Sequence, residues 1–134
     1  MTKEEIANKF CENTLMQHLG IIFTKVEEGK IEATMPVTAN HTQPMGLLHG
    51  GANAALAESV GSLGSAMLVD QKKQAVVGLQ ISANHLKSVS SGIVTAKGTI
   101  IHRGRTTHLW NIDIFDEQQQ LLSSCRLTNY IKTI

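Results

Sequence analysis

Residues 50–69 read GGANAALAESVGSLGSAMLV, a run that no proline interrupts. Its large apolar residues recur at intervals of four, three and four positions, which is helical spacing. These residues are Leu56, Val60, Leu63 and Met67. The opposite side carries glycine and alanine, and a helix that is apolar or small all round is typical of a buried position. The run therefore predicts a buried helix around which a sheet can wrap closely.

Six predicted strands flank this helix in the sequence, two before it and four after it. They span 20–26, 30–37, 75–86, 92–103, 107–116 and 121–132. No helical pattern separates the last four, so the sheet should be largely antiparallel. An amphipathic helix is expected before the first strand, at 3–18. We therefore predict an α+β fold in which a mostly antiparallel six-stranded sheet wraps one long central helix.

The composition limits the remaining possibilities. The 134 residues are 42% hydrophobic, enough for one core, so we expect a single domain over 1–134. A formal net charge of +1 argues against partners that need a concentrated basic surface, namely nucleic acid and the membrane surface. No signal peptide or membrane span is expected. The two cysteines, Cys11 and Cys125, are isolated, which favours a reducing, cytoplasmic location.

One carboxylate interrupts the apolar run. A chain that is 17% charged would carry about six charges between residues 33 and 69, and only Glu58 is present. A buried charge must be paired, neutralised or hydrogen-bonded. Glu58 could therefore pair with a base from the sheet, or its stretch of helix could reach the surface. However, Ser62 lies one turn further on the same face and no Lys or Arg lies one turn away, which favours a general base or a nucleophile.

The start of the predicted helix carries a second candidate. His49, Gly50 and Gly51 stand where backbone N–H groups are free and the helix dipole is positive. Glycine there lets a ligand atom approach the backbone, which is typical of an oxyanion or phosphate site. The alternative is that the two glycines only relieve crowding in a tight turn.

The spacing of the two candidates has a geometric consequence. Gly50 and Glu58 are eight residues apart, or roughly 12 Å along a helix. An oxyanion donor and an attacking group must both lie within about 3 Å of one reacting centre. One helix cannot satisfy this, but two antiparallel copies related by a two-fold axis can. We therefore expect at least a homodimer, with two sites across its interface.

These motifs resemble a known family. The run HTQPMGLLHGGA at 41–52, followed by Glu58 and by VGS at 60–62, resembles the signature of hotdog-fold thioesterases. The subgroup that it resembles includes phenylacetate-pathway, 4-hydroxybenzoyl-CoA and 1,4-dihydroxy-2-naphthoyl-CoA thioesterases. The resemblance implies the hotdog fold, pairing of two protomers into one continuous sheet, and assembly of two dimers into a tetramer.

The resemblance also implies catalytic roles. Glu58 matches the family's catalytic carboxylate, acting as nucleophile or general base, and Gly50 matches the N–H that polarises the thioester carbonyl. Gln43 and His49 match polar residues that hold or orient this carbonyl. Ser62 matches a hydroxyl that positions the substrate or the hydrolytic water.

Further positions are expected to contact the acyl group or coenzyme A. For the acyl group and the helix start these are Gly51, Leu63, Met67 and His85. Coenzyme A carries phosphates, so basic residues should lie near the pocket mouth. The candidates are Lys72, Lys73, Lys87 and, best of them, the Arg103-Gly104-Arg105 segment, although each base could also be an ordinary solvated surface charge. No cofactor is expected, since coenzyme A is part of the substrate, and no metal, because the histidines lack ligand spacing.

The expected reaction is hydrolysis of acyl-CoA thioesters to the free acid and CoA. The resemblance implies aromatic or aryl-acyl groups, and an acyl carrier protein could replace CoA. Two alternatives remain. One is a non-catalytic acyl-CoA-binding hotdog module, which should lack the carboxylate. The other is a hotdog dehydratase or hydratase acting on carrier-bound acyl chains, which the His49-Gly50-Gly51 start resembles less.

Overall fold

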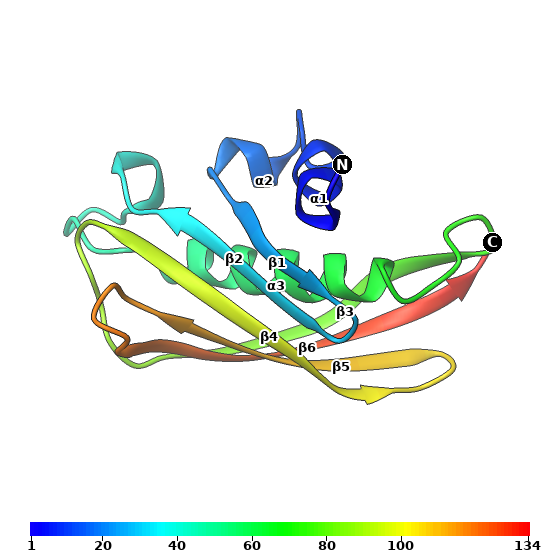
Figure 1. Ribbon diagram of the computed structural model, residues 1–134. Helices are drawn as coiled ribbons and strands as arrows, with labels where there is room; N and C mark the ends of the chain where they lie inside the picture. The colour runs from blue at the N-terminus through cyan, green and yellow to red at the C-terminus, as the bar shows by residue number, and fades with distance from the viewer.

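The computed structural model describes residues 1–134, with one long helix lying against one face of a six-stranded sheet (Figure 1). The helices are α1 (Lys3–Phe10), α2 (Leu15–His18), the 3-10 helix η1 (Ala39–His41) and α3 (Gly50–Ala66). The strands are β1 (Ile22–Glu27), β2 (Lys30–Pro36), β3 (Gln74–His85), β4 (Ile93–Arg103), β5 (Thr107–Phe115) and β6 (Leu121–Thr133). The predicted α+β arrangement is confirmed.

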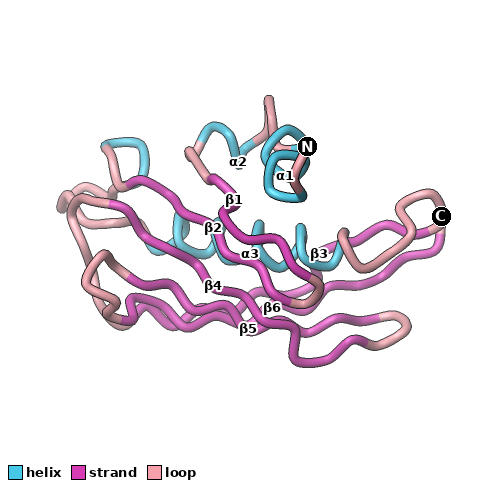
Figure 2. The backbone as a smooth tube through the Cα atoms, viewed as in Figure 1, coloured by secondary structure: helices cyan, strands magenta, loops and turns pink.

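The sheet has the order β1-β2-β4-β5-β6-β3, and every neighbouring pair is antiparallel. It curves around α3, as the tube drawing also shows (Figure 2). The last strand before the helix and the first strand after it are thus separated in the sheet, and β3 forms one edge. This edge strand has 12 residues, whereas β1 at the opposite edge has six.

The approach of α3 to the sheet depends on glycines. A Cβ on Gly61 would overlap Leu127, and one on Gly64 would overlap Trp110. On the sheet side, Gly98 of β4 makes room for Val60, whose side chain is fully buried. Small residues therefore let the sheet wrap closely, as expected, and glycines make these close approaches.

The prediction that α3 is buried all round is wrong for one face. Ala54, Ala55, Glu58 and Ser62 are only half-buried. The sheet covers the opposite face of the helix, and the short α1 and α2 cover only part of this one (Figure 1). One strip of α3 therefore remains open in the single chain.

The predicted N-terminal helix at 3–18 is also wrong, because it is two helices. The chain turns between them at Asn13, which has a φ of 61°. Asn13 donates its N–H to Gln17 Oε1 at 2.7 Å, and Thr14 donates its hydroxyl to Cys11 O at 2.5 Å. The side chains of Gln17 and Thr14 thus bond to backbone groups in place of helical hydrogen bonds, and hydrophobic periodicity does not detect that competition.

A buried polar cluster joins α3 to β5 and β6. Ser65 Oγ accepts hydrogen bonds from Trp110 Nε1 at 2.8 Å and from Asn129 Nδ2 at 3.0 Å. Its own proton is therefore donated to His108 Nδ1, 2.8 Å away, which requires a neutral imidazole. Burial lowers the pKa of His108, and Arg103 and His102 lower it further. The cluster thus fixes the rotation of α3 on the sheet and keeps His108 uncharged.

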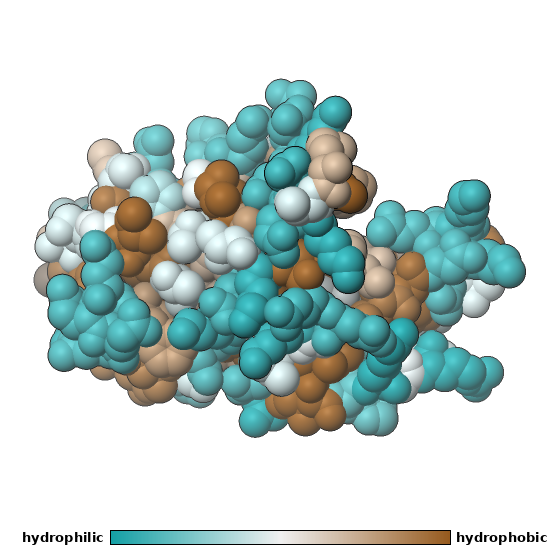
Figure 3. All heavy atoms as spheres, in the orientation of Figure 1, coloured by the Kyte–Doolittle hydropathy of each residue, from teal (hydrophilic) through white to brown (hydrophobic).

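The molecular surface is mixed. On the face seen in Figure 3, apolar residues form separate patches between polar ones. None of the helices is long and apolar enough to cross a membrane. Both cysteines are free and buried, and burial followed by the charge of Asp113 raises the pKa of Cys125 to about 11.

Candidate active site

Helix α3 carries both predicted parts of the site in one continuous run. Gly50 begins the helix and Glu58 lies in its third turn, so the two are separated by roughly 12 Å along the axis. A single chain therefore contains two half-sites. We refer to His49, Gly50 and His85 as the N-terminal half-site. Glu58, Ser62 and Gly78, whose Cβ position would lie 2.6 Å from Glu58 Oε2, form the carboxylate half-site.

The N-terminal half-site leaves one backbone donor free. His49 is the N-cap of α3, and its Nδ1 accepts the N–H of Gly51 at 2.7 Å. The imidazole hydrogen is therefore on Nε2. By contrast, the N–H of Gly50 donates to no group in the chain. The structure thus makes Gly50, and not Gly51, the available donor for an oxyanion.

His85 lies directly over Gly50. A Cβ on Gly50 would be 2.7 Å from His85 Nε2, so only glycine leaves room for this ring. The other ring nitrogen, Nδ1, is 2.8 Å from Ser123 Oγ, which also accepts a hydrogen bond from Asn53 Nδ2 at 3.1 Å. Sequence reasoning missed Asn53 and Ser123. Asn53 had a signal, since it stands three residues before Leu56 on the buried stripe, but Ser123 had none.

Gln43 is held within its own loop. Its N–H donates to Leu47 O at 2.8 Å, and its side-chain Oε1 accepts the N–H of Met45. The loop is attached to the N-terminal region by the buried His41, whose Nε2 is 2.6 Å from Leu19 O. The structure therefore places Gln43 in the segment that leads into α3, with no contact to Glu58 in the same chain.

The carboxylate half-site contains an unpaired acid. Glu58 forms no ion pair and no side-chain hydrogen bond, since the two ion pairs of the chain are Lys25–Glu32 and Arg103–Glu28. This excludes pairing with a base of the sheet, whereas the alternative of a helix that reaches the surface holds in part. Glu58 borders a cavity of about 330 Å³. The cavity is lined by Leu15, Met16, Ala55, Glu58, Ser59 and Ser62.

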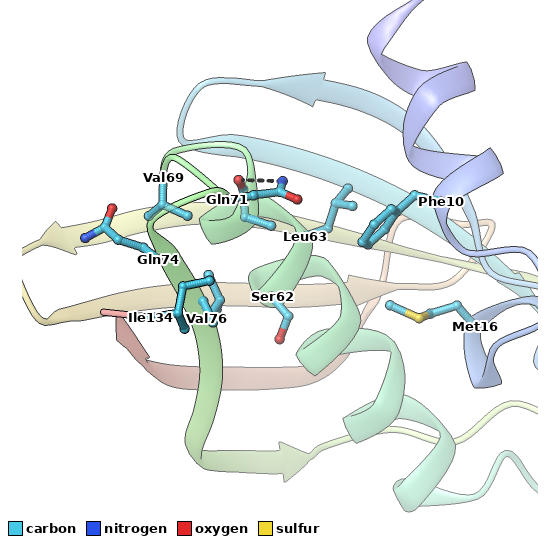
Figure 4. A pocket seen from close by; sticks show the side chains of 11 residues that line it. Phe10, Met16, Ser62, Leu63, Val69, Gln71, Gln74, Val76 and Ile134 are labelled. Atoms are coloured by element: carbon cyan, nitrogen blue, oxygen red, sulfur yellow. Dashed lines mark hydrogen bonds between the residues drawn. The ribbon is translucent and has the colours of Figure 1, made fainter. Parts of the chain in front are cut away.

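A second, mostly apolar cavity of about 320 Å³ adjoins the first (Figure 4). The two cavities share Met16 and Ser62. Leu63, Val76 and Ile134 line the apolar one, and Ser62 stands between Val76 and Met16 in the close view. Leu63 therefore lies where an acyl-binding residue is expected.

Met67 does not line this apolar cavity. It borders a separate hollow beside Arg103, on the other side of the C-terminal end of α3. Met67 is the C-cap of α3 and still donates its N–H to Leu63 O at 3.1 Å, so it keeps the helical spacing and nevertheless borders a different hollow. Its role in acyl binding stays a prediction.

The predicted phosphate-binding residues lie at opposite ends of α3. Arg103 donates to Glu28 Oε1 at 2.9 Å and to Leu68 O at 3.0 Å, just beyond the helix C-terminus. Gly104 closes the adjacent turn and Arg105 is exposed in it. Lys87 is also exposed, and follows His85 at the N-terminal end. The structure therefore does not gather these residues into one basic patch.

Comparisons with known proteins agree with this architecture. Residues 45–123 match a family model described as the thioesterase superfamily. The chain is 47% identical over 120 residues to the proofreading thioesterase EntH of Klebsiella pneumoniae, covering 90% of this chain and 87% of that protein.

Two solved structures show the same likeness in three dimensions. Thioesterase HI1161 of Haemophilus influenzae is 44% identical with a TM-score of 0.93, over 99% of this chain and 92% of that one. A variant of thioesterase PA1618 of Pseudomonas aeruginosa is 39% identical with a TM-score of 0.96, over 100% and 96% of the two chains.

Proposed function

This chain belongs to the thioesterase superfamily and is a thioester hydrolase of hotdog fold, and from this premise we propose that it hydrolyses acyl-CoA thioesters carrying aromatic or aryl-acyl groups. The observation that supports the proposal is the position of Glu58. This unpaired carboxylate borders one cavity, and Ser62, one turn away, connects that cavity to the apolar one.

The residues suit the chemistry of a thioester. Its thiolate leaving group is good, since a thiol has a pKa near 8.5, so little help from a general acid is needed. The reaction needs a base or nucleophile and an oxyanion donor. Glu58 would supply the first and the free N–H of Gly50 the second. Ser62, whose hydroxyl has no partner in the chain, would orient the substrate or the water.

The acyl group would enter the apolar cavity beyond Ser62. A volume of about 320 Å³ lies at the lower end of the range for small-molecule pockets. Leu63, Val76 and Phe10 offer apolar walls to a ring. Its carbonyl would then lie beside Glu58, with the coenzyme A portion leading outward.

A homodimer would complete the site. The edge strand β3 is long, and its apolar residues Val77 and Leu79 are exposed. Unpaired edges of this kind readily pair with a second copy. Antiparallel pairing of two β3 strands would set the two α3 helices antiparallel, bringing Gly50 of the partner subunit toward Glu58.

The direct test is release of free thiol from benzoyl-CoA by the wild type and by Glu58→Gln. Glu58→Gln keeps the shape of the side chain but removes the base, so we expect the rate to fall at least about 10³-fold. Equal rates of thiol release by the wild type and Glu58→Gln would contradict the catalytic role of Glu58. Tight binding without turnover by the wild type would favour the acyl-CoA-binding module, and a change at an enoyl double bond without thiol release would favour the dehydratase.

The substrate class needs a separate measurement. A panel of aryl, short alkyl and long alkyl acyl-CoA esters, each also offered on an acyl carrier protein, would rank acyl group and carrier together. We expect the largest kcat/KM for aryl-acyl CoA. A larger kcat/KM for alkyl chains would contradict the aryl assignment while leaving the role of Glu58 intact.

A further inference from the structure

We propose that Gly78 and Asn129 position the reacting groups around the Glu58 carboxylate. Gly78 leaves room for the carboxylate, and Asn129 is a second hydrogen-bond acceptor, beside Glu58, for the hydrolytic water. The inference rests on the proposed function of Glu58 and deepens it. It assigns positioning to two residues, one on β3 and one on β6, that no sequence motif indicated.

Gly78 provides the space in which the carboxylate lies. A Cβ built on Gly78 would be 2.6 Å from Glu58 Oε2, closer than atoms of these types approach. The backbone of Gly78 does not have a positive φ, so its conformation would accept alanine. An alanine at position 78 would therefore displace the Glu58 carboxylate from its observed position, while the backbone itself would accept it.

The strand geometry places this gap on the substrate path. Residues two apart in a strand face the same side, so Gly78 continues the surface on which Val76 lines the apolar cavity. The register then shifts between Gly78 and Gln80, leaving Leu79 as an extra residue. Such bulges occur often beside active sites, where they redirect a strand.

Asn129 lies directly opposite Gly78 across the β3–β6 ladder. Its Nδ2 donates to Gly61 O at 3.2 Å and to Ser65 Oγ at 3.0 Å. Because Gly61 O can only accept, the amide cannot be flipped, and Oδ1 must face the other way. Oδ1 lies 3.9 Å from the same Cβ point above Gly78 that is 2.6 Å from Glu58 Oε2.

The Asn129 oxygen has no partner within the protein, although the residue is fully buried. Buried acceptors without a partner are rare and call for an explanation. Here two acceptors, Asn129 Oδ1 and Glu58 Oε2, both lie within 4 Å of the Cβ position of Gly78. The group that satisfies both is a donor with two hydrogens, and water is the substrate of this reaction that has them.

This arrangement describes a general-base step. The water donates one hydrogen to Glu58 Oε2 and the other to Asn129 Oδ1, which leaves its lone pairs for the thioester carbon. As the new C–O bond forms, Oε2 takes the first proton and the second stays on the attacking oxygen. The C–S bond then breaks, and the departing thiolate takes up the proton from the carboxyl group.

The test of Gly78 uses a matched glycine. Gly98→Ala is the control, because its Cβ would also press on an α3 side chain, 2.7 Å from Val60 Cγ1, outside the site. With benzoyl-CoA, we expect Gly78→Ala to lower kcat at least tenfold with KM within about twofold, and Gly98→Ala to change kcat less than about twofold. Thermal unfolding verifies that both variants are folded.

A rescue experiment excludes a merely structural effect of the alanine. Glu58→Asp shortens the side chain by one methylene and withdraws the carboxylate from Gly78. In the Gly78→Ala background it should therefore cost much less kcat than in the wild type, a non-additive result typical of residues in contact. Additive losses, or a folded Gly78→Ala enzyme with wild-type kcat, would overturn the proposal.

Asn129 is tested against its own neighbour. Asn129→Leu removes the acceptor, whereas Ser65→Ala disturbs the same buried cluster and leaves Asn129 Oδ1 in place. We expect kcat to fall about tenfold in the first and less than about threefold in the second, with both folded. Equal losses would overturn the role of Asn129.

The Glu58→Gln variant separates failure of this inference from failure of the proposed function. If Glu58→Gln is fully active, the proposed function fails. If Glu58→Gln is inactive and Gly78→Ala keeps the wild-type kcat, only this inference fails.

Discussion

The two half-sites of α3 differ in how completely their polar groups are paired. In the N-terminal half-site, His49 holds the N–H of Gly51, and His85 is hydrogen-bonded to Ser123. In the carboxylate half-site, neither Glu58 nor Ser62 has a side-chain partner. The first half holds its side chains around one free backbone donor, although the neighbouring Asn53 Oδ1 is unpaired, while the second leaves its side-chain oxygens without partners.

This contrast fits the different roles that we propose for the two half-sites, oxyanion donor and base. An oxyanion donor is effective when it is fixed before charge develops, because no reorganisation is then needed. A base must instead exchange protons, so a permanent ion pair would compete with its function. The two halves also lie on one rigid helix, and only a second chain can bring them together. The following changes test the contrast, beginning with the largest expected effect.

Gly50→Ala should lower kcat about 10²-fold, because its Cβ would lie 2.7 Å from His85 Nε2 and block approach to the free N–H. Mixed with Glu58→Gln and reassembled, it should restore about a quarter of the wild-type rate, since half of the dimers are mixed and each has one intact site. Steady-state thiol release measures the rate of the single variant and that of the mixture. A mixture that is as inactive as each variant alone would show that the half-sites do not combine across an interface.

Ser123→Ala should lower kcat about tenfold by freeing the His85 ring over Gly50. Ser124→Ala is the matched control, because Ser124 is the next residue on β6 and has no side-chain hydrogen bond. Its kcat should stay within about twofold of the wild type. Equal losses in the two variants would indicate damage to β6 and not to the half-site.

Ser62→Ala should lower kcat/KM about fivefold, because the hydroxyl between the two cavities orients the substrate or the water. Ser59→Ala provides the comparison. Ser59 borders the same cavity as Glu58, but its hydroxyl is already donated to Ala55 O at 2.7 Å. If the two variants lose activity equally, an unpaired hydroxyl is not what distinguishes this half-site.

The smallest effect concerns stability at mildly acidic pH. Because burial lowers the pKa of His108, the unfolded chain binds this proton more readily than the folded one. The free energy of unfolding should therefore be highest above about pH 6.5 and fall as the pH drops, by at most about 1.4 kcal/mol per pH unit for one proton. Urea unfolding at pH 7.5 and 5.5 measures this difference, which His108→Asn should reduce while keeping an acceptor for Ser65.

The sequence predicted a helix or strand well where its apolar residues repeat with the period of that helix or strand. The long helix and all six strands were found because each repeats apolar residues over several turns or pleats. The break at Asn13 was missed, since one residue with positive φ and a few side-chain hydrogen bonds create no periodic signal. The open face of α3 was missed because alanine is equally compatible with burial and partial exposure.

The candidate site residues were likewise predictable only where the local sequence marks them. Glu58 and Gly50 could be proposed because each stands out from its local sequence, as a lone charge or a glycine pair. The spacing of Met67 with Leu63 did not show that the two residues border different hollows. Ser123 and Gly78 were missed because their importance comes from a neighbour on another element.

The sequence by itself determined the central helix, its single carboxylate and the glycine start, since helical and strand periods are local properties of the chain. The tertiary structure alone decided which polar groups meet. Asn53 and Ser123, which together hold His85, are 70 positions apart. Gly78 lies under Glu58 only because β3 forms the sheet edge beside α3. Such contacts depend on sheet order and register, and these are set by packing of the whole chain.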